Sequence, residues 1–471
     1  MVNTAFAMWD KSGHPLLGGP TSLSGLFGGC LATYPHMSDP FTDYDAADQR
    51  FVLGILTFDD GYNSSICLAV SQTSDPTMQW NVYSFPVSST PNNDLLDFPR
   101  PAIAANAIYV GGNLFHYQPG NSFCPNGFCF LGAGLYAYDK TPMYQGQPTR
   151  SLGYTISNHD TLIPARTVGI SDPAYSSGAE YFTAADNSCL MVTCNTIHLW
   201  KWNAFDGAAP TYQGSVTVND YGEPPDAVQP GTSATIDTND ARELDAYWAP
   251  DTASGDTIYG AHTIGCNPGG GTVACVQWYR LGHLEGTPVL LQQGILAGNG
   301  QYRFYPNLAV DGAGDMTIGY AYSSSSEYAG IRYTGLASDG TPEPEAVLKA
   351  GEGTIDGSRY GDFAGQVVDT DGCTIWHFEE YARAGSLWGT WAGSFRFSSC
   401  ATPDPGASPS PASTAVSPTS TVLPPTATAM QSTSTPAHTA TPTATDTPTP
   451  TAPATPIDIP SPTATGTARA A

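Results

Sequence analysis

Aspartates and arginines recur at the starts of similar segments along this chain of 471 residues. A typical segment runs through a predicted strand, a tight Asp/Gly turn and a second strand. If the segments are structurally equivalent, their aspartates converge on one face of the domain. Nearby arginines could then grip a carboxylate-bearing or hydroxyl-rich ligand there. The candidate ligand-binding residues are Asp39, Asp172, Asp245, Arg100, Arg242, Arg303 and Arg359.

The candidates for catalysis are three carboxyl groups in the last part of the aromatic-rich sequence. Glu379 and Glu380 follow an aromatic strand, and side chains that are adjacent along a strand point to opposite faces. One of the two, together with Asp362, could supply carboxyl groups about 5–9 Å apart, as glycoside hydrolysis requires. Two alternatives remain open for these residues. Each aspartate could cap a turn or pair with its neighbouring arginine, and the glutamates could be solvated at a strand end.

The sequence predicts no cofactor. It contains no G-x-S-x-G, H-E-x-x-H or phosphate-loop motif. Ca²⁺ is the one candidate metal, because Asp371 and the turn from Asp311 to Asp315 carry suitable oxygen ligands. The chain lacks a D-x-D-x-D-G run, so capping of the turns is the better interpretation of these aspartates.

The charge balance excludes one class of partner. The net charge is −26 with only 16 Lys and Arg residues, too few for a surface that binds a polyanion. We therefore expect no nucleic-acid partner. An acidic surface poor in lysine fits a secreted bacterial protein, a cation binder or a binder of neutral sugars.

All ten cysteines fall in the first 400 residues, and their spacing predicts disulfide bonds. Three close pairs are flanked by turn residues, another pair brackets the last strands, and the remaining two are partners by elimination. A zinc site is the rival interpretation, but no C-x-x-C motif or Cys/His cluster is present. The expected pairs are Cys124/Cys129, Cys189/Cys194, Cys266/Cys275, Cys373/Cys400 and Cys30/Cys67.

Five disulfides need an oxidising compartment, so we expect an extracellular or cell-wall-associated protein. The N-terminus opposes this expectation, because residues 1–15 show neither a basic region nor an apolar region of a signal peptide. No run of about 20 apolar residues exists, so no membrane span is predicted.

The composition divides the chain into three parts. Residues 401–471 consist of Pro, Thr, Ala and Ser with few apolar residues, which predicts a disordered, extended stalk. Residues 36–400 are rich in Gly, Tyr, Phe and Trp and are long enough for a large core. Residues 1–35 form an N-terminal extension.

The central part is predicted to be all-β. Short alternating runs separated by Gly, Asp, Asn and Pro clusters indicate strands, and helical periodicity is scarce. Six segment starts, near residues 39, 98, 171, 244, 305 and 360, are spaced as one four-stranded sheet each. Sheets repeated at this spacing close into a β-propeller. We predict six blades; seven blades or a two-sheet sandwich are the alternatives.

Three motifs carry a resemblance to a known family. They are Ser38-Asp39-Pro40, Arg359-Tyr360-Gly361-Asp362-Phe363 and Cys373-Thr374-Ile375-Trp376. Over residues 36–400 the sequence resembles a family of secreted bacterial β-propeller proteins. This resemblance implies the fold and little of the chemistry.

A more distant resemblance is to sialidase-like six-bladed propellers, whose turns carry a D-x-G motif. The turns at Asp369–Gly372 and Asp311–Gly314 have one residue too many, and no Arg-Ile-Pro motif is present. These departures put sialidase chemistry in doubt.

We therefore expect a secreted or cell-surface propeller, monomeric, that binds an extracellular glycan or cell-wall polymer through its channel face. The first alternative is a sialidase-like glycoside hydrolase or polysaccharide lyase. The second is a structural display domain without a catalytic site.

Overall fold

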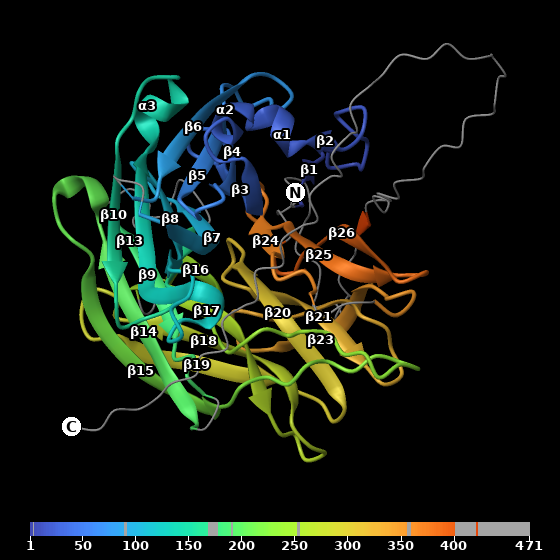
Figure 1. Ribbon diagram of the computed structural model, residues 1–471. Coiled ribbons are helices and arrows are strands. Elements are labelled where there is room, and N and C mark those ends of the chain that lie inside the picture. The colour runs from blue at the N-terminus through green and yellow to red at the C-terminus, as the bar shows by residue number, and fades with distance from the viewer. Residues whose placement is uncertain are drawn as a thin grey trace, which may run out of the picture.

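Six β-sheets are arranged around a central axis (Figure 1). This computed structural model describes residues 1–2, 4–88, 92–167, 178–189, 192–251, 255–355, 359–400 and 421–422. Each sheet is one blade, with four antiparallel strands that follow one another along the chain from the axis outward. The predicted six-bladed β-propeller is confirmed.

The blades follow the chain order. Blades 1 to 3 contain β3 (His36–Asp45), β4 (Arg50–Phe58), β5 (Ser64–Ser71), β6 (Trp80–Pro86), β7 (Asp94–Ile103), β8 (Ala107–Tyr117), β9 (Phe128–Asp139), β10 (Ser151–Ile156), β11 (Ile163–Pro164), β13 (Glu180–Ala185), β14 (Cys194–Trp202) and β15 (Thr211–Tyr221). Blades 4 to 6 contain β16 (Glu243–Asp251), β17 (Gly255–Cys266), β18 (Val273–Gly282), β19 (Val289–Leu296), β20 (Gln301–Val310), β21 (Met316–Ser324), β22 (Gly330–Leu336), β23 (Pro342–Lys349), β24 (Gly365–Val368), β25 (Ile375–Arg383), β26 (Leu387–Phe395) and β27 (Thr421–Val422).

Two strands depart from this simple order. β12 (Arg166–Thr167) follows β11, the innermost strand of blade 3, and pairs in parallel with β16 of blade 4. β27 pairs with β26 at Gly393 and Ser394. Apart from β27, the predicted stalk at residues 401–471 lies outside the described residues.

A β-bulge at the same place in three innermost strands explains the sequence repeat. Asp39, Phe98 and Tyr305 have φ of 51°, 57° and 55°, and each is followed by a proline. The pairing register shifts at these positions in β3, β7 and β20. A bulge leaves one residue outside the ladder and redirects its side chain, and proline is tolerated there because it has no N–H to donate. The bulges therefore change the direction of side chains near the starts of the innermost strands.

The five predicted disulfides are all present. Those at Cys124–Cys129, Cys189–Cys194 and Cys266–Cys275 each close the loop between the second and third strands of blades 2, 3 and 4. Because strands alternate in direction, these loops lie at the end of the propeller where the innermost strands begin. Cross-links of this kind restrict the loops and stabilise the fold against unfolding.

The N-terminal extension packs on blade 1. It contains β1 (Ala5–Phe6), β2 (Thr21–Ser22), α1 (Leu23–Leu26) and α2 (Gly28–Leu31). Leu23 and Phe27 are fully buried against Ile55 and neighbouring side chains of blade 1. The Cys30–Cys67 disulfide ties α2 to β5, so this extension is part of the folded domain.

Most of the large aromatic side chains with a given exposure lie in the core. Trp202, Trp248, Trp278 and Trp391 are each at most 9% exposed, whereas Trp388 is 48% exposed.

Among the described residues, helices such as α3 (Lys140–Tyr144) are too short and too polar to cross a bilayer.

Candidate binding site at the channel mouth

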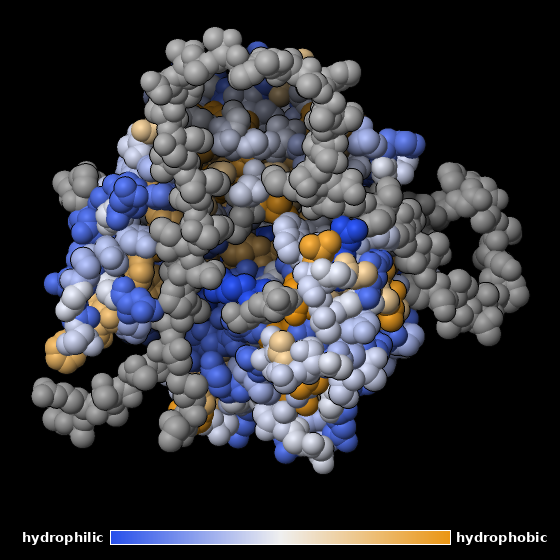
Figure 2. All heavy atoms as spheres, turned by 45° about the vertical axis from the view of Figure 1, so that its right-hand side comes forward, coloured by the Kyte–Doolittle hydropathy of each residue, from blue (hydrophilic) through white to orange (hydrophobic). Residues whose placement is uncertain are grey.

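Charged side chains from four blades meet at the end of the channel where the innermost strands begin. We call this group the mouth cluster: it consists of Asp39, Asp97, Arg100, Arg242, Arg359, Asp362 and Glu380. Blades 1, 2, 4 and 6 contribute to it, through β3, β7, β25 and the segments that lead into β16 and β24. In the space-filling view, hydrophilic side chains gather around a hollow near the middle of the face (Figure 2).

Asp97 is a partly buried carboxyl group of the mouth cluster. Burial and, after it, the charges of Asp39 and Asp362 raise its pKa to about 7. Arg242 and Arg359 act in the opposite direction but do not cancel the effect. Asp97 therefore exists largely in its protonated form at mildly acidic pH and can both donate and accept hydrogen bonds.

Asp362 remains accessible, with 26% of its side chain exposed. Its Oδ2 lies 3.8 Å from Nη2 of Arg359, whose side chain is 57% exposed. Burial and the nearby charge of Asp39 raise the pKa of Asp362 despite the arginines around it. This is a loose contact and not the tight ion pair of a purely structural site.

The two adjacent glutamates lie in different environments, as the strand alternation predicts. Glu380 lies beside Gly361 and Asp362; burial and then the charge of Asp362 raise its pKa to about 8. Glu379 is fully buried on the opposite face of β25, and its Oε2 lies 2.8 Å from Nε2 of His377. Of the two, only Glu380 belongs to the mouth cluster.

Aromatic rings hold Arg100 in place. Its guanidinium carbon lies 4.3 Å from the ring centroid of Phe98 and 4.2 Å from that of Phe363. Nη2 donates to the backbone oxygen of Asp362 over 2.5 Å. Burial lowers the pKa of Arg100 to about 10, so it stays charged at neutral pH.

Arg242 is bound by a carboxylate. Its Nε and Nη2 each donate to Asp240 over 2.6 Å, a bidentate pair that fixes the guanidinium plane. Its guanidinium carbon also lies 5.1 Å from the ring centroid of Phe98. The pair holds a positive charge next to Asp97 without leaving the guanidinium available to an anionic ligand.

Asp245 lies near Arg100 of the mouth cluster, but its own hydrogen bonds are to residues outside that cluster. It accepts two bonds from Nη2 of Arg166, at 2.6 and 2.9 Å, and one from the backbone N–H of Leu308. Asp43 lies close to this pair, and burial raises its pKa to about 6. This inner group connects blades 1, 4 and 5.

Sequence reasoning missed Asp43, Asp97 and Arg166. A signal for Arg166 was present, because it follows Pro164 by two residues, much as Arg100 follows Pro99 by one. No pattern distinguished Asp43 or Asp97 from the many other aspartates of the chain.

Besides Glu379 and Asp245, two further predicted residues are not in the mouth cluster. Arg303 is 7% exposed and donates through Nε to Glu345 over 2.8 Å, so it serves blade 5. Asp172 lies outside the described residues.

The candidate calcium ligands serve as turn caps. Asp311 accepts from the backbone N–H of Ala313 and Asp315, and Asp371 accepts from those of Cys373 and Thr374. Within the described part of the chain, no group of three or more His, Cys, Asp or Glu side chains is arranged to hold a metal ion.

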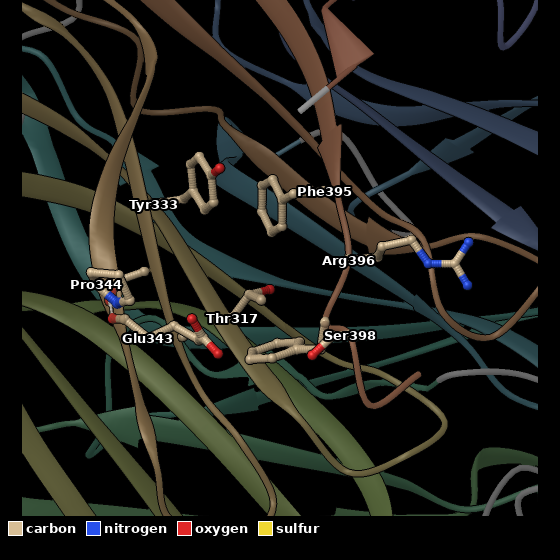
Figure 3. A pocket seen from close by; sticks show the side chains of 10 residues that line it. Thr317, Tyr333, Glu343, Pro344, Phe395, Arg396 and Ser398 are labelled. Carbon is tan, nitrogen blue, oxygen red and sulfur yellow. Dashed lines mark hydrogen bonds between the residues drawn. The ribbon is translucent and has the colours of Figure 1, made fainter. Parts of the chain in front are cut away.

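A small cavity lies between blades 5 and 6, at the end of the strands opposite the mouth (Figure 3). The rings of Tyr333 and Phe395 stack there with centroids 4.1 Å apart, and Glu343 points toward the cavity while Arg396 points away. Its volume of about 20 Å³ suits one water molecule and not a sugar.

No model of a protein family matches the chain, and no curated protein matches it. Among solved structures, a protein of unknown function from Dyadobacter fermentans DSM 18053 is 14% identical, with 76% of this chain and 94% of that chain covered and a TM-score of 0.45. The Hadza microbial sialidase Hz136 is 8% identical, with 73% and 63% covered and a TM-score of 0.38. A thermostable family-43 glycoside hydrolase is 11% identical, with 80% and 96% covered and a TM-score of 0.34. At these identities the similarity concerns the fold alone.

Proposed function

We propose that this protein is an extracellular propeller that binds a neutral glycan at its channel mouth. One observation carries the proposal: Asp97, Asp362 and Glu380 are held together with raised pKa values next to arginines that already have partners. A protonated carboxyl group donates one hydrogen bond and accepts others, as a sugar hydroxyl also does. The two kinds of group are therefore complementary.

The arginines argue for a neutral ligand. Arg242 is held by Asp240, and Arg100 is held by a backbone oxygen and two rings. Only Arg359 combines high exposure with a loose contact, at 3.8 Å from Asp362. A ligand with its own carboxylate, such as a sialic or uronic acid, would find only this one guanidinium group of the mouth cluster available as a partner, whereas the carboxyl groups suit the hydroxyls of a neutral sugar.

The disulfides support an extracellular location. Five cross-links would be reduced in a bacterial cytosol, whereas they persist outside the cell. The Pro/Thr-rich residues after position 400 fit a stalk that holds such a domain away from a surface.

The test is binding of neutral and acidic glycans on an array, followed by calorimetry with the best neutral ligand. We expect Asp362→Asn to weaken binding at least tenfold without lowering the melting temperature. The matched control is Asp339→Asn, an exposed turn aspartate on blade 5. Preferential binding of acidic glycans, or equal affinity of Asp362→Asn and the unmodified protein, would contradict the proposal.

Glycoside hydrolysis is the second candidate, and the proximity of Glu380 and Asp362 favours it. A general acid needs a pKa near the working pH, which the value of about 8 for Glu380 provides. Asp362 would then act as the ionised partner. If the protein is a hydrolase, we expect it to release a fluorophore from neutral aryl glycosides and Glu380→Gln to lose this activity. If no glycoside is cleaved, hydrolysis is refuted and the binding proposal remains.

A further inference from the structure

A pocket of about 210 Å³ lies on the outer strands of blade 5, where β22 begins and β23 ends. Because strands alternate in direction within a blade, this is the end of the propeller at which the channel mouth also lies. The residues that line the pocket include none of the mouth cluster, so the two are separate sites. We call it the blade-5 pocket; the side chains in its wall that matter here are those of Tyr322, Glu327, Tyr328, Arg332, Val347 and Lys349.

Two glycines bring the backbone segments of the pocket into close contact. A Cβ at Gly330 would lie 2.6 Å from the backbone oxygen of Lys349, and one at Gly351 would lie 2.4 Å from that of Ala329. Both distances are too short for any side chain. The loop before β22 and the segment after β23 therefore pack main chain against main chain, and a larger residue at either glycine would push them apart.

A network of charged groups fixes one wall of the pocket. Arg332 donates through Nη2 to Oε1 of Glu327 over 2.6 Å and through Nη1 to Glu345, which also accepts from Arg303. The hydroxyl of Tyr322 donates to Oε2 of Glu327 over 2.7 Å. The guanidinium carbon of Arg332 lies 3.7 Å from the ring centroid of Tyr322. Arg332 and Glu327 are thus held in one orientation before a ligand arrives, which lowers the entropy cost of binding.

The second cation of the pocket also has a partner. Lys349 donates through Nζ to Oε1 of Glu352 over 2.6 Å, and this hydrogen bond lowers the pKa of Glu352. Both cations of the pocket therefore have carboxylates beside them, and an anionic ligand would have to displace one of these. A carboxylate has about four lone-pair sites, so Glu327 can still accept hydrogen bonds from hydroxyl groups. This charge balance favours an uncharged ligand that carries hydroxyls.

The size and the apolar wall of the pocket indicate one sugar ring. A cavity of about 150 Å³ can hold a benzene molecule, so about 210 Å³ has room for one six-membered ring with hydroxyl substituents. Tyr328 is 38% exposed and Val347 is 54% exposed. The C–H faces of a sugar ring can pack on these two side chains while its hydroxyls bond to Glu327.

We propose that the blade-5 pocket binds one uncharged sugar unit and is a second carbohydrate site, independent of the channel mouth. This inference goes beyond the proposed function, because the pocket shares no residue with the mouth cluster and binds whether or not the mouth is occupied. Two sites on one molecule strengthen its attachment to a surface that presents many glycan chains.

The experiment is a saturation-transfer NMR titration of Asp362→Asn, in which the mouth site is weakened. The ligands are glucose, galactose, mannose, xylose and N-acetylglucosamine, with glucuronate and glucosamine as charged counterparts. We expect at least one neutral sugar to bind saturably with a Kd on the order of 1 mM, because a single ring has few atoms with which to contact the protein. The charged counterparts should bind more weakly.

Variants of Tyr328 place the sugar in the pocket. Adding Tyr328→Ala to Asp362→Asn should raise the Kd about three- to tenfold, the range of a lost ring contact, whereas Tyr328→Phe should leave it nearly unchanged. The matched control is Trp388→Ala, because Trp388 on β26 of blade 6 is 48% exposed and does not line the pocket. It should have no effect on the Kd.

The outcomes separate this proposal from the mouth site. If a sugar binds the unmodified protein but not Asp362→Asn, it binds at the mouth; the pocket is then refuted and the proposed function stands. The pocket is also refuted if no neutral sugar binds either protein, or if Tyr328→Ala and Trp388→Ala have the same effect. Tighter binding of glucuronate or glucosamine would overturn the ligand class. Binding to Asp362→Asn that Tyr328→Ala weakens supports the pocket even if no glycan binds at the mouth.

Discussion

Replacing Glu380 by Gln should stabilise the protein at neutral pH. The pKa of Glu380 is raised from 4.5 to about 8, first by burial and then by the charge of Asp362. The folded state therefore binds the proton more tightly than the unfolded state does. The stability that the folded state gains from this proton is fully present below pH 4.5 and is lost as the pH rises through 8. Gln is neutral at every pH and similar in shape to protonated Glu, so it removes this dependence.

The magnitude follows from the pKa. From pH 4.5 to 7 the free energy of unfolding falls by about 1.4 kcal/mol per pH unit because of Glu380, or by about 3 kcal/mol in all. Partial exposure of the side chain to solvent reduces this to about 1–2 kcal/mol. Glu380→Gln should thus raise the melting temperature at pH 7 by about 2–5 °C and have little effect at pH 4.

Calorimetry at pH 4, 5.5, 7 and 8 measures this effect, with Glu352→Gln as the control. The pKa of Glu352 is lowered, first by a hydrogen bond from Lys349, so its replacement should not stabilise the protein. A lower melting temperature of Glu380→Gln at pH 7, or the same change at pH 4 and pH 7, would refute the placement of Glu380 next to Asp362.

Three further predictions concern the framework. Thiol titration of the denatured, unreduced protein should find essentially no free cysteine; two or more free thiols would contradict the extracellular assignment. Lys140→Met removes the ammonium group that lies 2.5 Å from the buried carboxylate of Asp45, and it should lower the free energy of unfolding by about 3–5 kcal/mol. Denaturant titration measures this change, and a loss below about 1 kcal/mol would show that the pair is not buried in solution. Ending the chain at residue 424 should leave the melting temperature unchanged, whereas ending it at residue 400 removes β27 and should lower it slightly; equal melting temperatures would show that β27 adds no stability.

The fold was largely predictable because its signals are local. Each turn needs Asp or Gly, and each bulge in β3, β7 and β20 places a residue of positive φ before a proline, so the repeat is visible in the sequence. The close cysteine pairs were equally local. The members of the mouth cluster near the strand starts, such as Asp39 and Asp362, followed from this alignment.

The rest of the site depended on side-chain direction, which no local pattern encodes. Arg303 begins an innermost strand as predicted, yet its side chain turns to Glu345 within blade 5. Asp97 lies in the mouth cluster, and Arg166 lies beside Asp245, only because blades that are distant in sequence meet at the axis.

Two groups of buried charge differ in their effect on stability, and this difference is one reason why we propose ligand binding at the mouth cluster. Burial alone would raise the pKa of Asp45, but the charge of Lys140 and its hydrogen bond lower it, so this carboxylate stabilises the folded state at neutral pH. At the mouth, Asp97, Asp362 and Glu380 all have raised pKa values, so each destabilises the fold as it ionises. The same chain thus contains an ion pair arranged for stability and a cluster that costs stability. Groups of the second kind concentrate at functional sites, because a ligand whose hydroxyls bond to these carboxyl groups recovers the cost on binding.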